Sequence, residues 1–70
     1  MIERLTKISR EVHERRKSLG LSQQELADLA GCSTRFIHAL EHGKRTVRLD
    51  KLLDVLEVLG MELTATVRRT

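Results

Sequence analysis

The sequence predicts an all-α domain: a bundle of four to five short helices followed by one short C-terminal β-strand. Three observations support this class. Apolar residues recur at helical spacing along most of the chain, glycine or serine separates the periodic stretches, and Phe36 is the one aromatic residue. With 70 residues, 40% of them hydrophobic, the chain can form one compact core but not a core and a deep substrate cleft.

The first helix is expected over residues 1–19. Its apolar positions fall on one helical stripe, formed by Ile2, Leu5, Ile8, Val12 and Leu19. Charged residues occupy the other faces, and three basic residues in the last turn suit the negative end of the helix dipole. Gly20 then provides a left-handed stop.

Two further helices are indicated by their capping residues. The run Ser22-Gln23-Gln24-Glu25 has the pattern of a capping box and starts a helix that ends at Gly31. Ser33 can cap the next helix, which continues to about Glu41. The inward positions of these two helices are expected to be Leu26, Leu29, Ala30, Ile37 and Leu40.

A fourth helix is expected from about residue 49 to residue 59, with a dense apolar face of Leu49, Leu52, Leu53, Leu56 and Leu59. After Gly60 the residues alternate strictly between apolar and polar, which predicts a strand. A lone strand in a helical chain leaves its backbone groups unpaired, so we expect it to pair with a second copy. The candidate dimerisation residues are Met61, Leu63, Ala65 and Val67, and the chain divides into a domain at 1–60 and a tail at 61–70.

Positive charge is concentrated in one segment. The net charge is +3, and residues 33–48 carry four basic residues against Glu41 alone, while the rest of the chain is balanced. A positive patch on a neutral body is typical of a surface that binds a polyanion.

Residues 22–41 have the organisation of a helix-turn-helix: two short helices joined by a tight turn. Ala27 allows the second helix to cross the first closely, and Gly31 suits the turn. The outer side of the second helix then presents Thr34, Arg35 and His38 near the end that reaches base edges in the major groove.

Several other classes of protein are disfavoured. The sequence has no apolar run long enough for a membrane helix and no signal-peptide pattern, so we expect a cytoplasmic, nucleoid-associated protein. One cysteine and three histidines lack zinc-ligand spacing. No nucleophile, base and orienting group converge, so we expect no enzyme activity, cofactor or metal.

The motif residues resemble those of the Xre/Cro family of phage-repressor-type DNA-binding domains. The resemblance rests on three stretches, Leu19-Gly20-Leu21-Ser22-Gln23-Gln24-Glu25-Leu26-Ala27, Ala30-Gly31-Cys32-Ser33 and Ile37-His38-Ala39-Leu40-Glu41-His42-Gly43-Lys44. It implies base-reading positions at Thr34, Arg35, His38 and Ala39. Phosphate contact or buttressing of the recognition helix falls to Gln23, Gln24, Ser33, Lys44 and Arg45.

The end of the chain is similar to the HipB-like antitoxins, which are partners of HipA-type kinase toxins. The similarity covers residues 44–53 and 59–61 and the strand that follows. It implies a homodimeric repressor that binds a palindromic operator and a HipA-like kinase toxin. A mixed-sign face of the first helix, with Arg4, Lys7, Glu11, Glu14 and Arg15, is the expected docking surface for that toxin. The alternatives are a stand-alone phage-type or restriction-controller regulator, or a protein-interaction adaptor.

Overall fold

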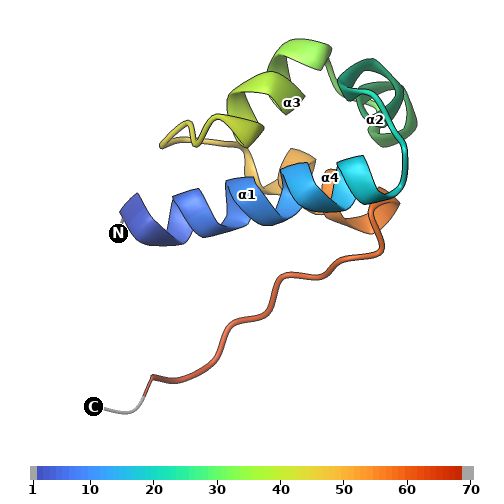
Figure 1. Cartoon of the computed structure of the whole chain (residues 1–70). Helices are drawn as coiled ribbons and strands as arrows, with labels where there is room; N and C mark the ends of the chain where they lie inside the picture. The colour runs from blue at the N-terminus through green and yellow to red at the C-terminus, as the bar shows by residue number, and fades with distance from the viewer. Residues whose placement is uncertain (1, 69–70) are drawn as a thin grey trace.

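The computed structural model describes the backbone of residues 2–68 and the side chains of residues 6–68. Within these limits the chain forms four helices, α1 (Ile2–Ser18), α2 (Gln23–Ala30), α3 (Thr34–Glu41) and α4 (Leu49–Val58). Helix α2 packs on both α3 and α4, and α1 packs on α3 (Figure 1). The predicted all-α helix-turn-helix bundle is confirmed in this arrangement. No helix in the described part is long and apolar enough to cross a membrane.

Side-chain caps define the start of both central helices. The Ser22 hydroxyl accepts a hydrogen bond from the Glu25 amide at 3.0 Å, and the Glu25 carboxylate accepts one from the Ser22 amide at 2.8 Å. The Ser33 hydroxyl accepts from the Phe36 amide at 3.0 Å. These bonds satisfy amides that a helix start leaves without partners, which is why a local sequence pattern predicts them well.

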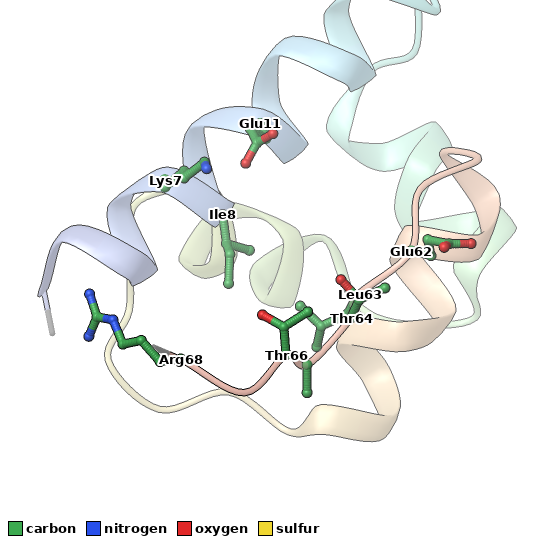
Figure 2. Close-up of a pocket in the computed structure, with 9 residues that line it drawn as sticks. Lys7, Ile8, Glu11, Glu62, Leu63, Thr64, Thr66 and Arg68 are labelled. Carbon is green, nitrogen blue, oxygen red and sulfur yellow. The ribbon is translucent and has the colours of Figure 1, made fainter. Parts of the chain in front are cut away.

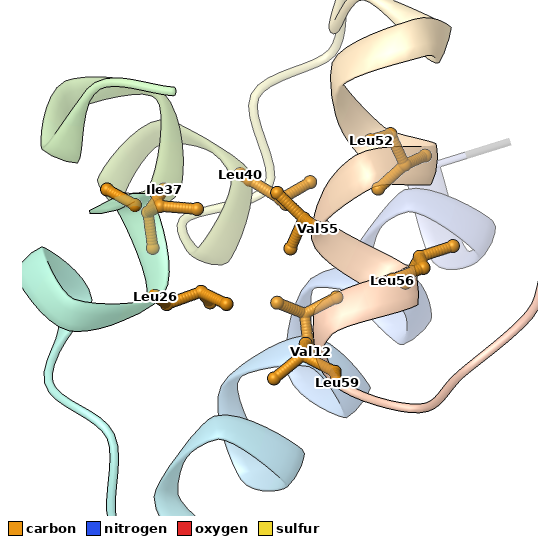
Figure 3. Packing of buried hydrophobic residues seen from close by; sticks show 9 residues of the cluster. Val12, Leu26, Ile37, Leu40, Leu52, Val55, Leu56 and Leu59 are labelled. Atoms are coloured by element: carbon orange, nitrogen blue, oxygen red, sulfur yellow. The ribbon is translucent and has the colours of Figure 1, made fainter. Parts of the chain in front are cut away.

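The core draws on all four helices, and its packing is shown in Figure 3. Its buried members are Val12, Leu26, Ala27, Ile37, Leu40, Leu52, Val55, Leu56 and Leu59. Ala27 is completely buried, as expected for a residue at a close helix crossing. Met61, just after α4, also packs against this cluster.

Four leucines that the helical pattern placed inward are exposed instead. Leu29 is 62% exposed, Leu49 59%, and Leu19 and Leu53 are each 44% exposed. In α2, the buried pair of Leu26 and Ala27 sets the inward direction, so Leu29 falls on the flank of the helix. The side chains of Ile2, Arg4 and Leu5 lie outside the described residues.

The predicted C-terminal strand is not formed in the described tail, residues 61–68. The Met61 amide donates to the Leu56 carbonyl at 2.8 Å, and no backbone ladder follows it before residue 69. A strand requires a partner edge, and the helical body of a single chain provides none. The expected interface residues Leu63, Ala65 and Val67 are therefore exposed, Val67 to 96%.

The tail runs back along the molecule toward the start of α1 (Figure 1). Tail and helix face each other across an open hollow of about 840 Å³, which Figure 2 shows from close by. From α1 this hollow is lined by Lys7, Ile8 and Glu11, and from the tail by residues 62–66 and Arg68.

Candidate nucleic-acid interface

The turn between α2 and α3 is built from backbone geometry. Gly31 ends α2 with a left-handed φ of 72°, and the Cys32 amide donates to the Ala27 carbonyl at 3.0 Å. Ile37 and Leu40 bury the inner side of α3. Arg35 and His38, two of the predicted base-reading residues, are exposed on α3.

Thr34, the first residue of α3, is half-buried and connected to α2. Its hydroxyl donates to the Gln24 side-chain carbonyl at 2.8 Å. The Gln24 amide in turn donates to the Asp28 carboxylate at 2.8 Å. Gln24, expected either to contact phosphate or to buttress the recognition helix, is thus hydrogen-bonded to the first residue of α3. The sequence analysis did not include Asp28 in this group.

Gln23 points to a different place, the C-terminal end of α3. Its side-chain amide donates to Glu41 at 3.2 Å, and the same carboxylate receives two bonds from Arg16 at 2.6 and 3.0 Å and one contact from His13 at 2.7 Å. Arg16 also donates to the Leu21 carbonyl at 2.7 Å. One buried ion pair therefore holds α1, the start of α2 and the end of α3 together.

The Glu41 carboxylate has a strongly shifted pKa. Its side chain is only 2% exposed, and burial by itself raises the pKa of a carboxyl group. The hydrogen bonds from Arg16, His13 and Gln23 outweigh burial and lower the pKa of Glu41 to about 2. Glu41 is thus charged at neutral pH and fixes the orientation of α3.

The loop after α3 presents the other predicted contact residues. Lys44 and Arg45 are both exposed. A hollow of about 380 Å³ lies between α3, this loop and α4, and its wall contains four basic residues, namely Arg35, Lys44, Arg48 and Lys51. Ser33 and Ala39 line the same hollow beside Phe36. Ala39 is half-buried and the Ser33 hydroxyl is engaged as a helix cap.

The two histidines of this face lie against each other. The ring centroids of His38 and His42 are 4.0 Å apart, and His42 Nδ1 donates to the His38 carbonyl at 2.7 Å. His42 ends α3, and the chain then turns at Gly43 toward the basic loop.

The structure therefore brings four of the nine predicted contact residues, Ser33, Arg35, Ala39 and Lys44, to one hollow. His38 and Arg45 are exposed outside its lining. Sequence reasoning missed Arg16 and Glu41, because these two residues lie 25 positions apart and no local motif marks the pair. It also missed Asp28, which lies four positions from Gln24 on one helix, a spacing that could have indicated the hydrogen bond.

Comparison with known proteins agrees with this geometry. Residues 12–65 match the family model described as helix-turn-helix. The uncharacterized HTH-type transcriptional regulator y4mF of Sinorhizobium fredii (strain NBRC 101917 / NGR234) is 48% identical over 48 residues. The matched region spans 69% of this chain and 63% of that relative. The chain belongs to the Xre-type helix-turn-helix family.

Proposed function

We propose that the protein is a sequence-specific repressor that reads operator DNA with the outer side of α3. The observation that carries this proposal is the basic surface of α3 and its following loop. Arg35, Lys44 and Arg45 are exposed, and none of them forms an ion pair with another described residue. Exposed cations without an ion-pair partner suit a polyanionic ligand, because contact with its phosphates does not require an existing ion pair within the protein to break.

The chemistry of the exposed residues supports a division of roles. Arg35 stands near the start of α3, and a guanidinium fork matches the two acceptors of guanine in the major groove. Lys44 and Arg45 belong to a loop at the other end of α3, where point charges position the protein on the backbone. Base reading is proposed for Thr34, Arg35, His38 and Ala39, and phosphate contact for Ser33, Lys44 and Arg45.

We infer that the operator is palindromic and is bound by a homodimer. The support is the tail, where Leu63 and Val67 are exposed apolar residues and the described backbone has no ladder. Pairing of two tails would bury these side chains and satisfy the backbone of both copies. A two-fold dimer places its recognition helices about 34 Å apart, one turn of DNA.

The experiment that tests the DNA-binding proposal is selection from a pool of randomised duplexes. The expected result is enrichment of an inverted repeat whose half-sites lie about one helical turn apart. Enrichment of a single half-site would support the proposal of a DNA-binding repressor and contradict the proposal that it binds as a dimer. Recovery of no sequence from the pool would contradict the proposal and favour a protein-interaction adaptor of the same fold.

We further propose that the repressor is the antitoxin of a type II toxin–antitoxin pair and binds a HipA-like kinase toxin. Support comes from the resemblance of residues 44–53 and 59–61 to HipB-like antitoxins. Helix α1 offers a mixed-charge face with Lys7, Glu11 and Glu14 exposed, and such a face suits a polar interface. Of the two other expected members, Arg15 is exposed and donates to the Leu59 carbonyl at 2.8 Å, and the side chain of Arg4 lies outside the described residues.

A purification from native cells tests the antitoxin proposal. A kinase-sized partner should be retained by the protein and lost from the double variant Glu11→Lys and Glu14→Lys, while operator binding is not weakened. Glu57→Lys on α4 is a control, because it reverses one exposed carboxylate on a different helix, beside Leu29 and Ala30 of α2. Purification of the protein with DNA and no partner protein would contradict the antitoxin proposal. It would favour a stand-alone regulator of the phage or restriction-controller type.

A further inference from the structure

Two hydrogen bonds connect Asp28 to Gln24 and Gln24 to Thr34, and we call this chain of three side chains the relay. We propose that Asp28, a residue on α2, sets the base preference of Thr34 by fixing the orientation of the Gln24 side-chain amide. This inference rests on the proposed function, since it takes the start of α3 to be the base-reading end. It concerns the direction of each hydrogen bond in the relay.

The amide of Gln24 has one acceptor end and one donor end, and it can face Thr34 with either. A carboxylate can only accept hydrogen bonds, so Asp28 draws the donor end, Nε2, toward itself. The two residues are four positions apart on α2 and are joined at 2.8 Å. The acceptor end, Oε1, is left to face Thr34, and it receives the hydroxyl proton at 2.8 Å.

The Thr34 hydroxyl therefore has no proton to donate elsewhere. A hydroxyl has one donor and two acceptor positions, and Gln24 uses the donor. Thr34 can then only accept from a base. In the major groove the donors are the N6 amino group of adenine and the N4 amino group of cytosine. Guanine N7 and O6 and thymine O4 are acceptors and gain nothing from Thr34.

The expected wild-type preference is thus adenine or cytosine at the base that Thr34 faces. One neutral hydrogen bond corresponds to roughly five- to tenfold in affinity. The preference should disappear in Thr34→Val, which keeps the shape of the side chain and removes the hydroxyl. That variant identifies the base pair concerned.

The decisive variant is Asp28→Lys. An ammonium group only donates, so it draws Oε1 of Gln24 toward position 28 and turns Nε2 toward Thr34. The Thr34 hydroxyl then accepts from Gln24 and its proton becomes available to a base. The preference at the same base pair should change from adenine or cytosine to guanine or thymine. Asp28→Glu keeps an acceptor and should retain the wild-type preference.

Charge alone is controlled by Asp54→Lys. Asp54 is exposed on α4, and this variant adds the same charge without touching the relay. Both lysine variants should gain affinity for all DNA, so the measured quantity is the base preference obtained from randomised duplexes. Far-UV circular dichroism verifies that each variant is folded, which is expected because Asp28 and Asp54 are both exposed.

The outcomes separate this inference from the proposed function. Selection of one operator by all variants, with the same base preferred in wild type and Asp28→Lys, would overturn the relay and leave the repressor intact. A preference in wild type for guanine or thymine at the Thr34-dependent position would overturn it as well. If wild type selects no sequence, the proposed function fails, and the inference fails with it.

Discussion

The ion pair of Glu41 with Arg16 makes the stability of the fold depend on pH. Protonation of Glu41 removes the charge that anchors α1, α2 and α3 to one another, so the fold should weaken at low pH. The pKa of this carboxyl is lowered from 4.5 to about 2 in the folded chain. A group with a lowered folded pKa contributes stability above its unfolded pKa, and that stability is lost as pH falls through the folded value.

The magnitude follows from the shift. Each pKa unit corresponds to about 1.4 kcal/mol, so the charged form of Glu41 contributes about 3 kcal/mol at neutral pH. The contribution should begin to decline near pH 5 and be gone near pH 2. Small domains are stable by roughly 5–15 kcal/mol, so this one carboxylate is a considerable share.

Urea denaturation at a series of pH values between 7 and 2 measures this effect. The chain has no Trp and no Tyr, so far-UV circular dichroism is the appropriate signal. Glu41→Gln should be less stable at pH 7 and should lack most of the wild-type decline. The matched control is Glu57→Gln, an exposed glutamate of α4 outside the ion pair, which should decline as wild type does.

Two results would refute this reasoning. One is a wild-type decline between pH 5 and pH 2 that Glu41→Gln reproduces in full. The other is a titration midpoint for the Glu41 carboxyl carbon, followed by nuclear magnetic resonance, at or above 4.5. That direct measurement remains informative if Glu41→Gln is too unstable for denaturation experiments.

Three further predictions concern DNA binding, assembly and the turn. Lys44→Ala and Arg45→Ala should weaken binding to every duplex, whatever its sequence. The slope of log affinity against log salt should fall by about 1 for each phosphate that the protein no longer neutralises. An unchanged slope would show that these side chains do not contact the DNA. Deletion of residues 61–70 should shift the protein toward monomer in sedimentation velocity, and an unchanged dimer would assign the interface to the α4 surface. Gly31→Ala should lower the free energy of unfolding by about 1–2 kcal/mol, because the backbone at this position is left-handed, with φ of 72°. The added methyl has no neighbour within 4 Å, so no new packing offsets this cost. An unchanged melting temperature would contradict the prediction.

Local patterns explain how much of the fold could be predicted. The caps at Ser22 and Ser33 depend on residues within three positions, so the sequence alone locates them. The apolar spacing correctly indicates the buried positions Ile37 and Leu40 in α3 and Leu52 and Leu56 in α4. Leu29 and Leu53 were misplaced because a short helix with many apolar residues does not show which of them lies at the centre of the buried face.

The candidate site was predictable in its positions but not in its connections. Exposure of Arg35 and Lys44 follows from a basic segment outside the core pattern. The Arg16–Glu41 pair joins residues 25 positions apart, and nothing in the local sequence distinguishes it from ordinary surface charge. In the tail, by contrast, the local sequence predicts a structure that one chain does not form. The alternation of apolar and polar residues predicts a strand, but a single chain offers no partner strand for it.

The central claim is that α3 reads bases, and one comparison tests it most directly. Fluorescence anisotropy gives the affinities of wild type and Arg35→Ala for the selected duplex and for a shuffled duplex of equal length, at one salt concentration. Removal of a bidentate hydrogen bond to a base is expected to weaken binding to the selected duplex by about 1–3 kcal/mol, with a clearly smaller effect on the shuffled duplex. Equal weakening on both duplexes would show that Arg35 touches only phosphate and would contradict the account.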